Sequence, residues 1–158
     1  MQVPFSNISY FFYFRCDCYQ KNVLREAKPM VENAVKEVYM AHHPKTMIIA
    51  DLGCCAGPNT FLFISSVIDI IADQTKCTGD DHVELQFFLN DLPSNDFNEL
   101  FRSIQTFKRS VATNETTRVP PLYYISGLPE TYYSRLFPCE SVHLFHSEYC
   151  LHWRSKVF

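Results

Sequence analysis

The sequence predicts an α/β fold in which a parallel sheet carries helices on both faces, and three observations support that prediction. Strand-type and helix-type patterns alternate along the 158 residues, as is typical of such folds. Residues 46–50 form a short, largely apolar run that ends at Asp51, Leu52 and Gly53, the pattern of a buried parallel strand. Hydrophobic residues make up 47% of the chain and aromatic residues 15%, which indicates a packed core rather than disorder.

Periodicity and capping signals predict the elements in order. Apolar residues on one helical face, among them Leu24 and Val31, predict a helix over 23–41, with Pro29 in its first turn or at a kink. Residues 61–72 are apolar almost all round, which predicts a buried helix whose first turn suits Pro58. Residues 94–96 supply N-cap chemistry for a third helix. The remaining predicted elements are strands at 46–50, 83–90, 122–126 and 141–146, a helix over 97–107 and a short helical stretch at 132–136.

The net charge, the cysteine content and the lengths of the apolar runs limit the classes of protein to which this chain can belong. The formal net charge is −3 with no long run of one sign, which disfavours a nucleic-acid partner. The seven cysteines are odd in number and irregularly spaced, so reduced thiols of a cytoplasmic protein are expected, without a disulfide framework or a metal site. No stretch approaches the roughly 20 apolar residues that cross a bilayer. The aromatic run at 10–14 has no basic residue before it, so neither a signal peptide nor a membrane partner is expected.

The turn after the first predicted strand is the strongest candidate for ligand binding. Ligands of open α/β sheets bind beyond the carboxyl ends of the strands. Gly53 and Gly57 allow a ligand to approach the backbone closely, and Asp51 and Asn59 place polar groups beside it. The spacing fits neither the dinucleotide fingerprint nor a P-loop. These residues favour a methyltransferase-type turn, and the alternative is a tight strand-to-helix turn that binds nothing.

Four motifs in this chain resemble those of one family, the plant SABATH methyltransferases. Residues 51–60 read DLGCCAGPNT, residues 87–98 read FFLNDLPSNDFN, residues 133–143 read YSRLFPCESVH and residues 146–153 read HSEYCLHW. The resemblance implies a Rossmann-like class I methyltransferase fold that uses S-adenosylmethionine to convert small carboxylic acids into methyl esters. The residues of these motifs are most similar to those of grass enzymes that act on anthranilate, benzoate or salicylate. Jasmonate is a substrate of other family members.

The resemblance also implies roles for individual residues. Those expected to contact the cofactor are Tyr13, Asp51, Cys54, Asn59, Asp91, Leu92, Thr131 and Tyr132. Those expected to line the substrate pocket are Gln20 and Trp153, as donors to the carboxylate, with Tyr149 and His152 beside them. No catalytic residue and no metal are implied. Without the resemblance, Tyr149 and Trp153 would be read as core aromatics and His152 as a buried, hydrogen-bonded histidine.

Departures from the family pattern predict a partial domain. Residues 1–19 are an atypical N-terminal segment that places Cys16 and Asp17 where the family has Asn and Ser, and residues 20–158 are a partial methyltransferase domain. Family members are more than twice as long, so the later strands and a helical cap are expected to be missing. Glu130 and Glu148 replace small residues beside the cofactor. The alternative is therefore a catalytically inactive fragment that binds cofactor at most, or pairs with an intact relative; the assembly considered is a homodimer.

Overall fold

Strands and helices alternate along most of the chain in the computed structural model, which describes residues 6–79, 83–113 and 120–148, without the side chains of residues 6–22, 24, 112 and 113. Three helices and four strands lie in these ranges. They are α1 (Ser6–His42), β1 (Thr46–Leu52), α2 (Asn59–Thr78), β2 (Glu84–Asp91), α3 (Phe97–Thr113), β3 (Tyr123–Pro129) and β4 (Leu144–Ser147). All four strands were expected from the sequence, and their observed ends differ from the predicted ends by at most three residues.

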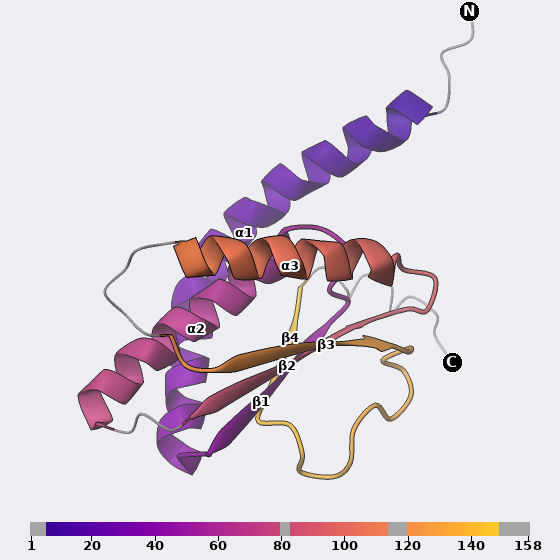
Figure 1. Cartoon of the computed structure of the whole chain (residues 1–158). Helices are drawn as coiled ribbons and strands as arrows, with labels where there is room; N and C mark the ends of the chain where they lie inside the picture. Colours follow the sequence, from indigo (N-terminus) through magenta and orange to yellow (C-terminus); the bar gives the residue numbers. More distant parts are fainter. Residues whose placement is uncertain (1–5, 80–82, 114–119, 149–158) are drawn as a thin grey trace, which may run out of the picture.

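The four strands form one parallel sheet in the order β3-β2-β1-β4, which confirms the predicted α/β architecture (Figure 1). Ile49 of β1 lies opposite Phe87 of β2 and Leu144 of β4, and Phe87 lies opposite Ile125 of β3. Alternate residues of a strand point to the same face. These four side chains therefore form one apolar row across the sheet. Ile49 and Phe87 belong to the buried core cluster, and Ile125 and Leu144 are partly buried against it.

The described helices lie on one face of the sheet, so the prediction of helices on both faces is wrong for this part of the chain. Tyr39 of α1, Ile64 of α2 and Leu100 of α3 are buried in the core cluster that contains the apolar row. Phe61 of α2 and Phe107 of α3 stack with ring centroids 5.1 Å apart. For α2 and α3 the reason is topological, because right-handed crossovers that step in one direction, from β1 to β2 to β3, place their helices on the same side. Helix α1 precedes β1 and packs against α2.

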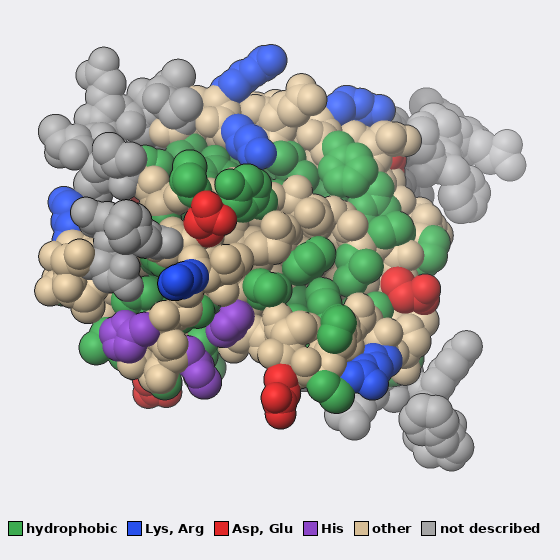
Figure 2. Space-filling view, turned by 60° about the horizontal axis from the view of Figure 1, so that its bottom comes forward, with side chains coloured by type: hydrophobic (Ala, Val, Ile, Leu, Met, Phe, Trp, Pro, Cys, Tyr) green, Lys and Arg blue, Asp and Glu red, His purple; other side chains and the backbone are tan. Residues whose placement is uncertain are grey.

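The opposite face, which we call the loop face, carries the side chains of Phe88, Tyr124 and Phe145 together with the connection over residues 130–143. This connection reverses direction from β3 back to β4, so it crosses the side away from α3 (Figure 1). Phe137 lies between Phe88 and Phe145, with centroids 5.4 and 5.8 Å away. Tyr124 is still 48% exposed and Phe145 is 55% exposed. Viewed from this side, the molecule shows many hydrophobic side chains at its surface (Figure 2).

Helix α1 begins at Ser6, much earlier than the predicted residue 23, and its first turns project away from the sheet (Figure 1). No glycine or proline occurs between residues 6 and 28, so nothing in the sequence stops the helix from continuing. The prediction followed the apolar stripe that begins near Leu24, and the described residues Val31, Val35 and Val38 of that stripe pack in or against the core. Pro29 consequently lies inside the helix and not in its first turn.

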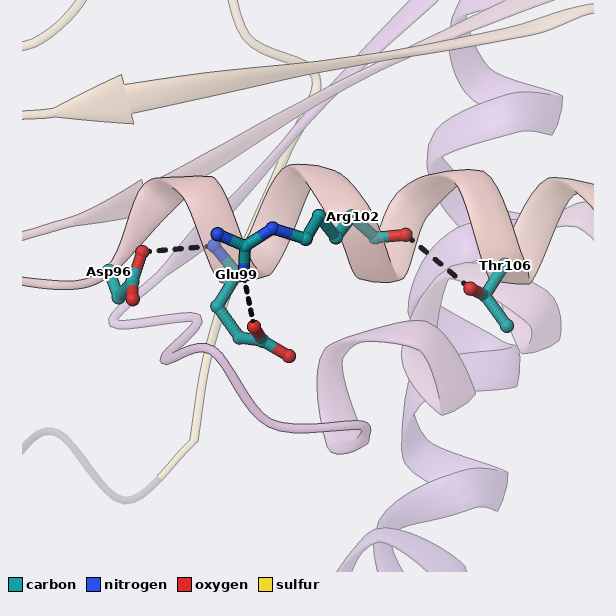
Figure 3. A network of polar contacts seen from close by, with 4 residues as sticks. All are labelled: Asp96, Glu99, Arg102 and Thr106. Atoms are coloured by element: carbon teal, nitrogen blue, oxygen red, sulfur yellow. Dashed lines mark hydrogen bonds and ion pairs between the residues drawn. The ribbon is translucent and has the colours of Figure 1, made fainter.

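Polar contacts begin and support α3, and the one at its start comes from the predicted N-cap residues. Asp96 accepts a hydrogen bond from the Glu99 amide at 2.9 Å, which satisfies one of the free amides of the first turn (Figure 3). Arg102 donates to Glu99 at 2.6 Å, and the Arg102 carbonyl accepts from Thr106 one turn later. The exposed side of α3 is thus polar, while Leu100 and Ile104 are buried against the sheet.

The short helix predicted at 132–136 does not form, and this segment is a series of turns. Ser134 donates its amide to Thr131, which closes a single turn that no further backbone hydrogen bond continues among the described contacts. Arg135 instead donates to the Phe137 carbonyl and to the Cys139 sulfur. Strand β4 then starts three residues later than predicted, after His143 has paired with Ile48 through both its amide and its ring.

Candidate functional site

The loop after β1 is hydrogen-bonded to the end of β2. The amides of Gly53 and Cys54 both donate to the carbonyl of Asn90, at 2.8 and 2.9 Å. Gly53 has φ 76°, a conformation that glycine adopts without steric cost. Cys55 has φ 56°, which is costly for a residue with a Cβ, and strained positions of this kind collect at ligand sites. The polypeptide is therefore held in a tight curve at the carboxyl edge of the sheet.

Asp91 is the half-buried carboxylate at the end of β2, and it faces this loop. One of its oxygens accepts a hydrogen bond from the Cys55 amide at 2.7 Å, and the other accepts from the Leu92 amide at 2.7 Å. Leu92 is 50% exposed beside it. The strained conformation of Cys55 thus points its amide toward the Asp91 carboxylate.

Asp51 is the penultimate residue of β1 and is only 4% exposed. One of its oxygens accepts from the Thr60 hydroxyl at 2.5 Å, and the other lies 2.7 Å from Nδ1 of His146. The His146 ring stacks on Phe63 with centroids 3.8 Å apart. Asp51 therefore joins the end of β1 to the first turn of α2 and to the end of β4.

Two of these Asp51 partners, Thr60 and His146, were not among the predicted site residues. His146 ends the fourth predicted strand, and parallel strands bring their carboxyl ends to one edge. That placement was enough to bring His146 near Asp51. Thr60 ends the 51–60 motif, but its bond to Asp51 was not predicted because this contact depends on how α2 leaves the turn.

Acidic groups gather around the buried thiol of Cys54. Burial raises the pKa of this thiol far above its ordinary value, and the charges of Asp51 and Asp91 raise it further. Burial also raises the pKa of Glu148, an effect that His146 opposes and Asp51 reinforces. The carboxyl edge of β1 and β2 therefore carries negative charge in a partly desolvated setting, which favours a cationic ligand.

The turn after β3 is fastened to the same edge. The Glu130 amide donates to the Asp91 carbonyl at 3.0 Å, and Thr131 donates its amide to the Glu130 side chain at 2.8 Å. Tyr132 is half-buried and, with Leu52 and Phe137, lines a cavity of about 230 Å³ on the loop-face side of the sheet. Thr131 and Tyr132 are therefore the two residues that come next in the chain after Glu130, which is hydrogen-bonded to Asp91.

The structure brings one group of the predicted residues together and leaves another outside its description. Those that lie at the carboxyl edge are Asp51, Cys54, Asn59, Asp91, Leu92, Thr131 and Tyr132. Tyr13 and Gln20 lie in α1, where side chains are not described, and Tyr149, His152 and Trp153 lie outside the described residues. The predicted substrate pocket therefore stays a prediction.

Within residues 6–79, 83–113 and 120–148, no group of three or more His, Cys, Asp or Glu side chains is arranged to hold a metal ion. In the same part of the chain, no helix is long and apolar enough to cross a membrane. Cys54, Cys55, Cys77 and Cys139, the cysteines whose side chains are described, are free thiols.

The sheet has strand order 3-2-1-4, a glycine turn follows β1, and an acidic residue ends β2. These features together are typical of α/β proteins that bind a nucleoside-containing cofactor at the carboxyl edge of the sheet. The profile of the SAM dependent carboxyl methyltransferase family matches residues 12–158. The chain belongs to this family, as the sequence motifs predicted. S-adenosylmethionine, the expected cofactor, is the one that the family description names.

Individual relatives agree with this assignment. The chain is 60% identical over 147 residues to a benzoate O-methyltransferase of Zea mays and 55% identical over 144 residues to an anthranilate O-methyltransferase 2 of the same plant. In both cases 87% of the chain and 38% of the relative are covered. A solved structure of a loganic acid methyltransferase with SAH matches with a TM-score of 0.70 and 34% identity, covering 89% of this chain and 38% of that one. The chain thus spans about two fifths of the length of these relatives.

Proposed function

We propose that the chain supplies the cofactor-binding part of an O-methyltransferase that forms methyl esters of small carboxylic acids of the anthranilate, benzoate or salicylate type. The observation that carries the proposal is the acidic carboxyl edge, where Asp91 and Asp51 lie on either side of the glycine turn. The relatives named for anthranilate and benzoate support this substrate class. A jasmonate-type acid stays within the proposed range.

The residues at this edge fit S-adenosylmethionine. Its sulfonium and ammonium groups are cationic, and the carboxylates of Asp51 and Asp91 make the edge acidic. Asp91 would hold the ribose hydroxyls, with Leu92 and Tyr132 against the adenine and Asn59 and Tyr13 toward the methionine end. The bound cofactor supplies an electrophilic methyl group on sulfur.

The proposed reaction does not require a general acid or base from the protein. A benzoate-type acid has a pKa of about 4, so at neutral pH its carboxylate is already the nucleophile and needs no general base. The protein orients this carboxylate and excludes water. Gln20 and Trp153 would donate hydrogen bonds to the carboxylate, with Tyr149 and His152 lining the pocket. Neutral donors of this kind orient the nucleophile without the strong pairing that an arginine would impose.

A second candidate is a fragment that binds cofactor without catalysis. Two observations favour it, the coverage of only 38% of the relatives and the presence of Glu130 and Glu148 at the edge. One relative, 48% identical, is an inactive anthranilate O-methyltransferase 1 of Zea mays. On this account the 158-residue chain forms no methyl ester unless a second chain completes the pocket.

The proposal includes a cytoplasmic location and a homodimeric assembly. Free thiols at Cys54, Cys55, Cys77 and Cys139 fit a reducing compartment. The apolar side chains of the loop face offer a surface on which a second copy can pack.

A chimera tests the substrate end of the proposal. Residues 16–157 are fused to the C-terminal part of the Zea mays benzoate O-methyltransferase, with Cys16→Asn and Asp17→Ser restoring the family residues. The chimera is expected to methylate benzoate, anthranilate or salicylate. Gln20→Ala and Trp153→Phe are each expected to lower kcat/KM about ten- to a hundredfold, because each removes a hydrogen bond to a charged group.

The matched control is Gln105→Ala on the exposed side of α3, which should leave kcat/KM unchanged. The loss of kcat/KM in the two test variants should be the same for substrates with different ring substituents, since these donors bind the carboxylate that all the substrates share. If both variants stay within about twofold of the parent chimera, the carboxylate is held by other residues and the proposed substrate site is wrong.

A further inference from the structure

Asn90 lies at the point where the ends of three strands meet, and it is completely buried although its side chain is polar. Its main-chain carbonyl accepts the amides of Gly53 and Cys54 from the loop after β1. Its side-chain nitrogen donates to the carbonyls of Leu128 and Glu130, at 2.9 and 2.7 Å. One residue of β2 thus bonds the turn after β1 on one side and the turn after β3 on the other.

The orientation of the Asn90 amide follows from its surroundings. Two carbonyl oxygens face the side-chain nitrogen, so the reverse orientation would set an oxygen against two oxygens. The side-chain oxygen is buried and has no hydrogen-bond partner among the described residues. An apolar side chain of similar shape would avoid this cost but would lose the two bonds that the amide donates.

Those two bonds act on the segment that carries Thr131 and Tyr132. The Glu130 carbonyl held by Asn90 belongs to the residue just before Thr131, and the Glu130 amide is bonded to the Asp91 carbonyl. Adjacent residues of β2 therefore have different tasks. Asp91 presents its carboxylate at the edge, and Asn90 fixes the position of the turn after β3 relative to that carboxylate.

We propose that Asn90 is a positioning residue for the cofactor, which sets the distance between Asp91 and the Thr131–Tyr132 turn and contacts no cofactor atom itself. This inference rests on the proposed function, because it concerns the same edge. If Thr131 and Tyr132 contact the adenosine part, losing the two Asn90 bonds weakens every ligand that contains adenosine by one common factor. A residue that matters only for stability would leave these affinities unchanged wherever the protein is still folded.

The test measures affinity and local opening in the 158-residue chain. Asn90→Leu keeps the approximate shape and removes both donated bonds, and Thr75→Val is the matched control, a buried hydroxyl of α2 that donates to the Ala72 carbonyl. Calorimetry is run with S-adenosylhomocysteine and with 5′-methylthioadenosine, which lacks the amino-acid end. Hydrogen exchange is followed at residues 128–132, and circular dichroism shows that each variant is folded.

We expect Asn90→Leu to weaken both ligands about tenfold or more, by the same factor, and to speed exchange at residues 128–132. Thr75→Val should lower the melting temperature and leave both affinities as they are. Affinities within about twofold of wild type in Asn90→Leu, or unchanged exchange at residues 128–132, would overturn the proposal.

If the wild-type chain binds neither ligand, the proposed function fails, and the exchange comparison alone then decides whether Asn90 holds the turn. If Asn90→Leu does not fold, Asn90→Ser, which keeps only a shorter donor, is measured in the same way.

Discussion

Individual side chains at the carboxyl edge are arranged as a set of carboxylates, each held by different partners. Asp51 is bonded on both oxygens by Thr60 and His146, and it is almost inaccessible. Asp91 is bonded by backbone amides and remains half-buried. At the scale of the residue, Asp51 is thus a structural tie between β1, α2 and β4, whereas Asp91 is the carboxylate available at the edge.

Glu148 gives a pH-dependent prediction at this scale. Burial raises the pKa of Glu148 in the folded chain above the ordinary value of 4.5, so the fold favours its protonated form. At neutral pH the ionised carboxylate therefore lowers stability, and this cost disappears as the pH falls below the ordinary value. Glu148→Gln should raise the free energy of unfolding at about pH 7.5 and leave it unchanged at about pH 4.

Urea unfolding at the two pH values measures this difference. The control is Glu37→Gln, which alters an exposed carboxylate of α1 and should have the same small effect at both. An equal gain from Glu148→Gln at both pH values, or a loss at neutral pH, would contradict the assigned environment of Glu148.

Among the secondary-structure elements, the strands were predicted well from the sequence and the helix boundaries less well. Apolar runs mark strands because a buried parallel strand has no polar face. The start of α1 was wrong because helix propagation needs no core contact, and the helix predicted at 132–136 was wrong because side-chain bonds from Arg135 replaced the backbone ladder. The candidate site was predictable where motifs carry it, at Asp51 and Asp91. Thr60 and Asn90 lie inside the quoted motifs, but their roles were not predicted because they depend on contacts between elements that no local pattern encodes.

The packing of α3 on β3 depends on the absence of a side chain at Gly127. A Cβ there would lie 2.9 Å from Cζ of Phe101 and 3.0 Å from Cδ1 of Phe97. Gly127→Ala should therefore lower the free energy of unfolding by about 1–2 kcal/mol, because both rings must shift. Phe101 is 47% exposed and its ring end can move, which keeps the expected cost toward the lower end.

A double-mutant cycle measured by urea unfolding isolates this contact. In a Phe101→Ala background, Gly127→Ala should cost clearly less than in the wild type, since one of the two crowded rings is absent. Equal costs in both backgrounds would show that the Phe101 ring does not limit the approach of α3 to β3.

On the scale of the whole molecule, the described part of the chain is a sheet with one face covered by helices and the other by a loop. Parallel sheets are normally covered on both faces. The loop face retains exposed apolar side chains at Leu122, Tyr124 and Phe145. The relatives are longer than this chain by more than a factor of two, since 38% of their length is covered. These observations together predict that the isolated 158-residue chain associates with itself.

Sedimentation velocity tests the predicted self-association. The wild-type chain should form oligomers or precipitate, and the pair Leu122→Lys and Tyr124→Lys should shift it toward monomer by placing charge on the loop face. Met30→Lys, at a 76% exposed position of α1, is the control and should change nothing. A monodisperse wild-type monomer with a sharp thermal transition would show that the loop face needs no partner.

If the carboxyl edge of this sheet binds the cofactor of the carboxyl methyltransferase family, calorimetry should detect binding of S-adenosylhomocysteine to the 158-residue chain. The wild-type chain should bind weakly, and Asp69→Ala, which removes an exposed carboxylate of α2, should leave the affinity unchanged. Asp91→Ala should weaken binding at least about tenfold, because it removes charged hydrogen bonds to the ligand and releases the Cys55 amide. No binding by the wild-type chain, or an affinity in Asp91→Ala within about twofold of the wild-type value, would contradict the claim.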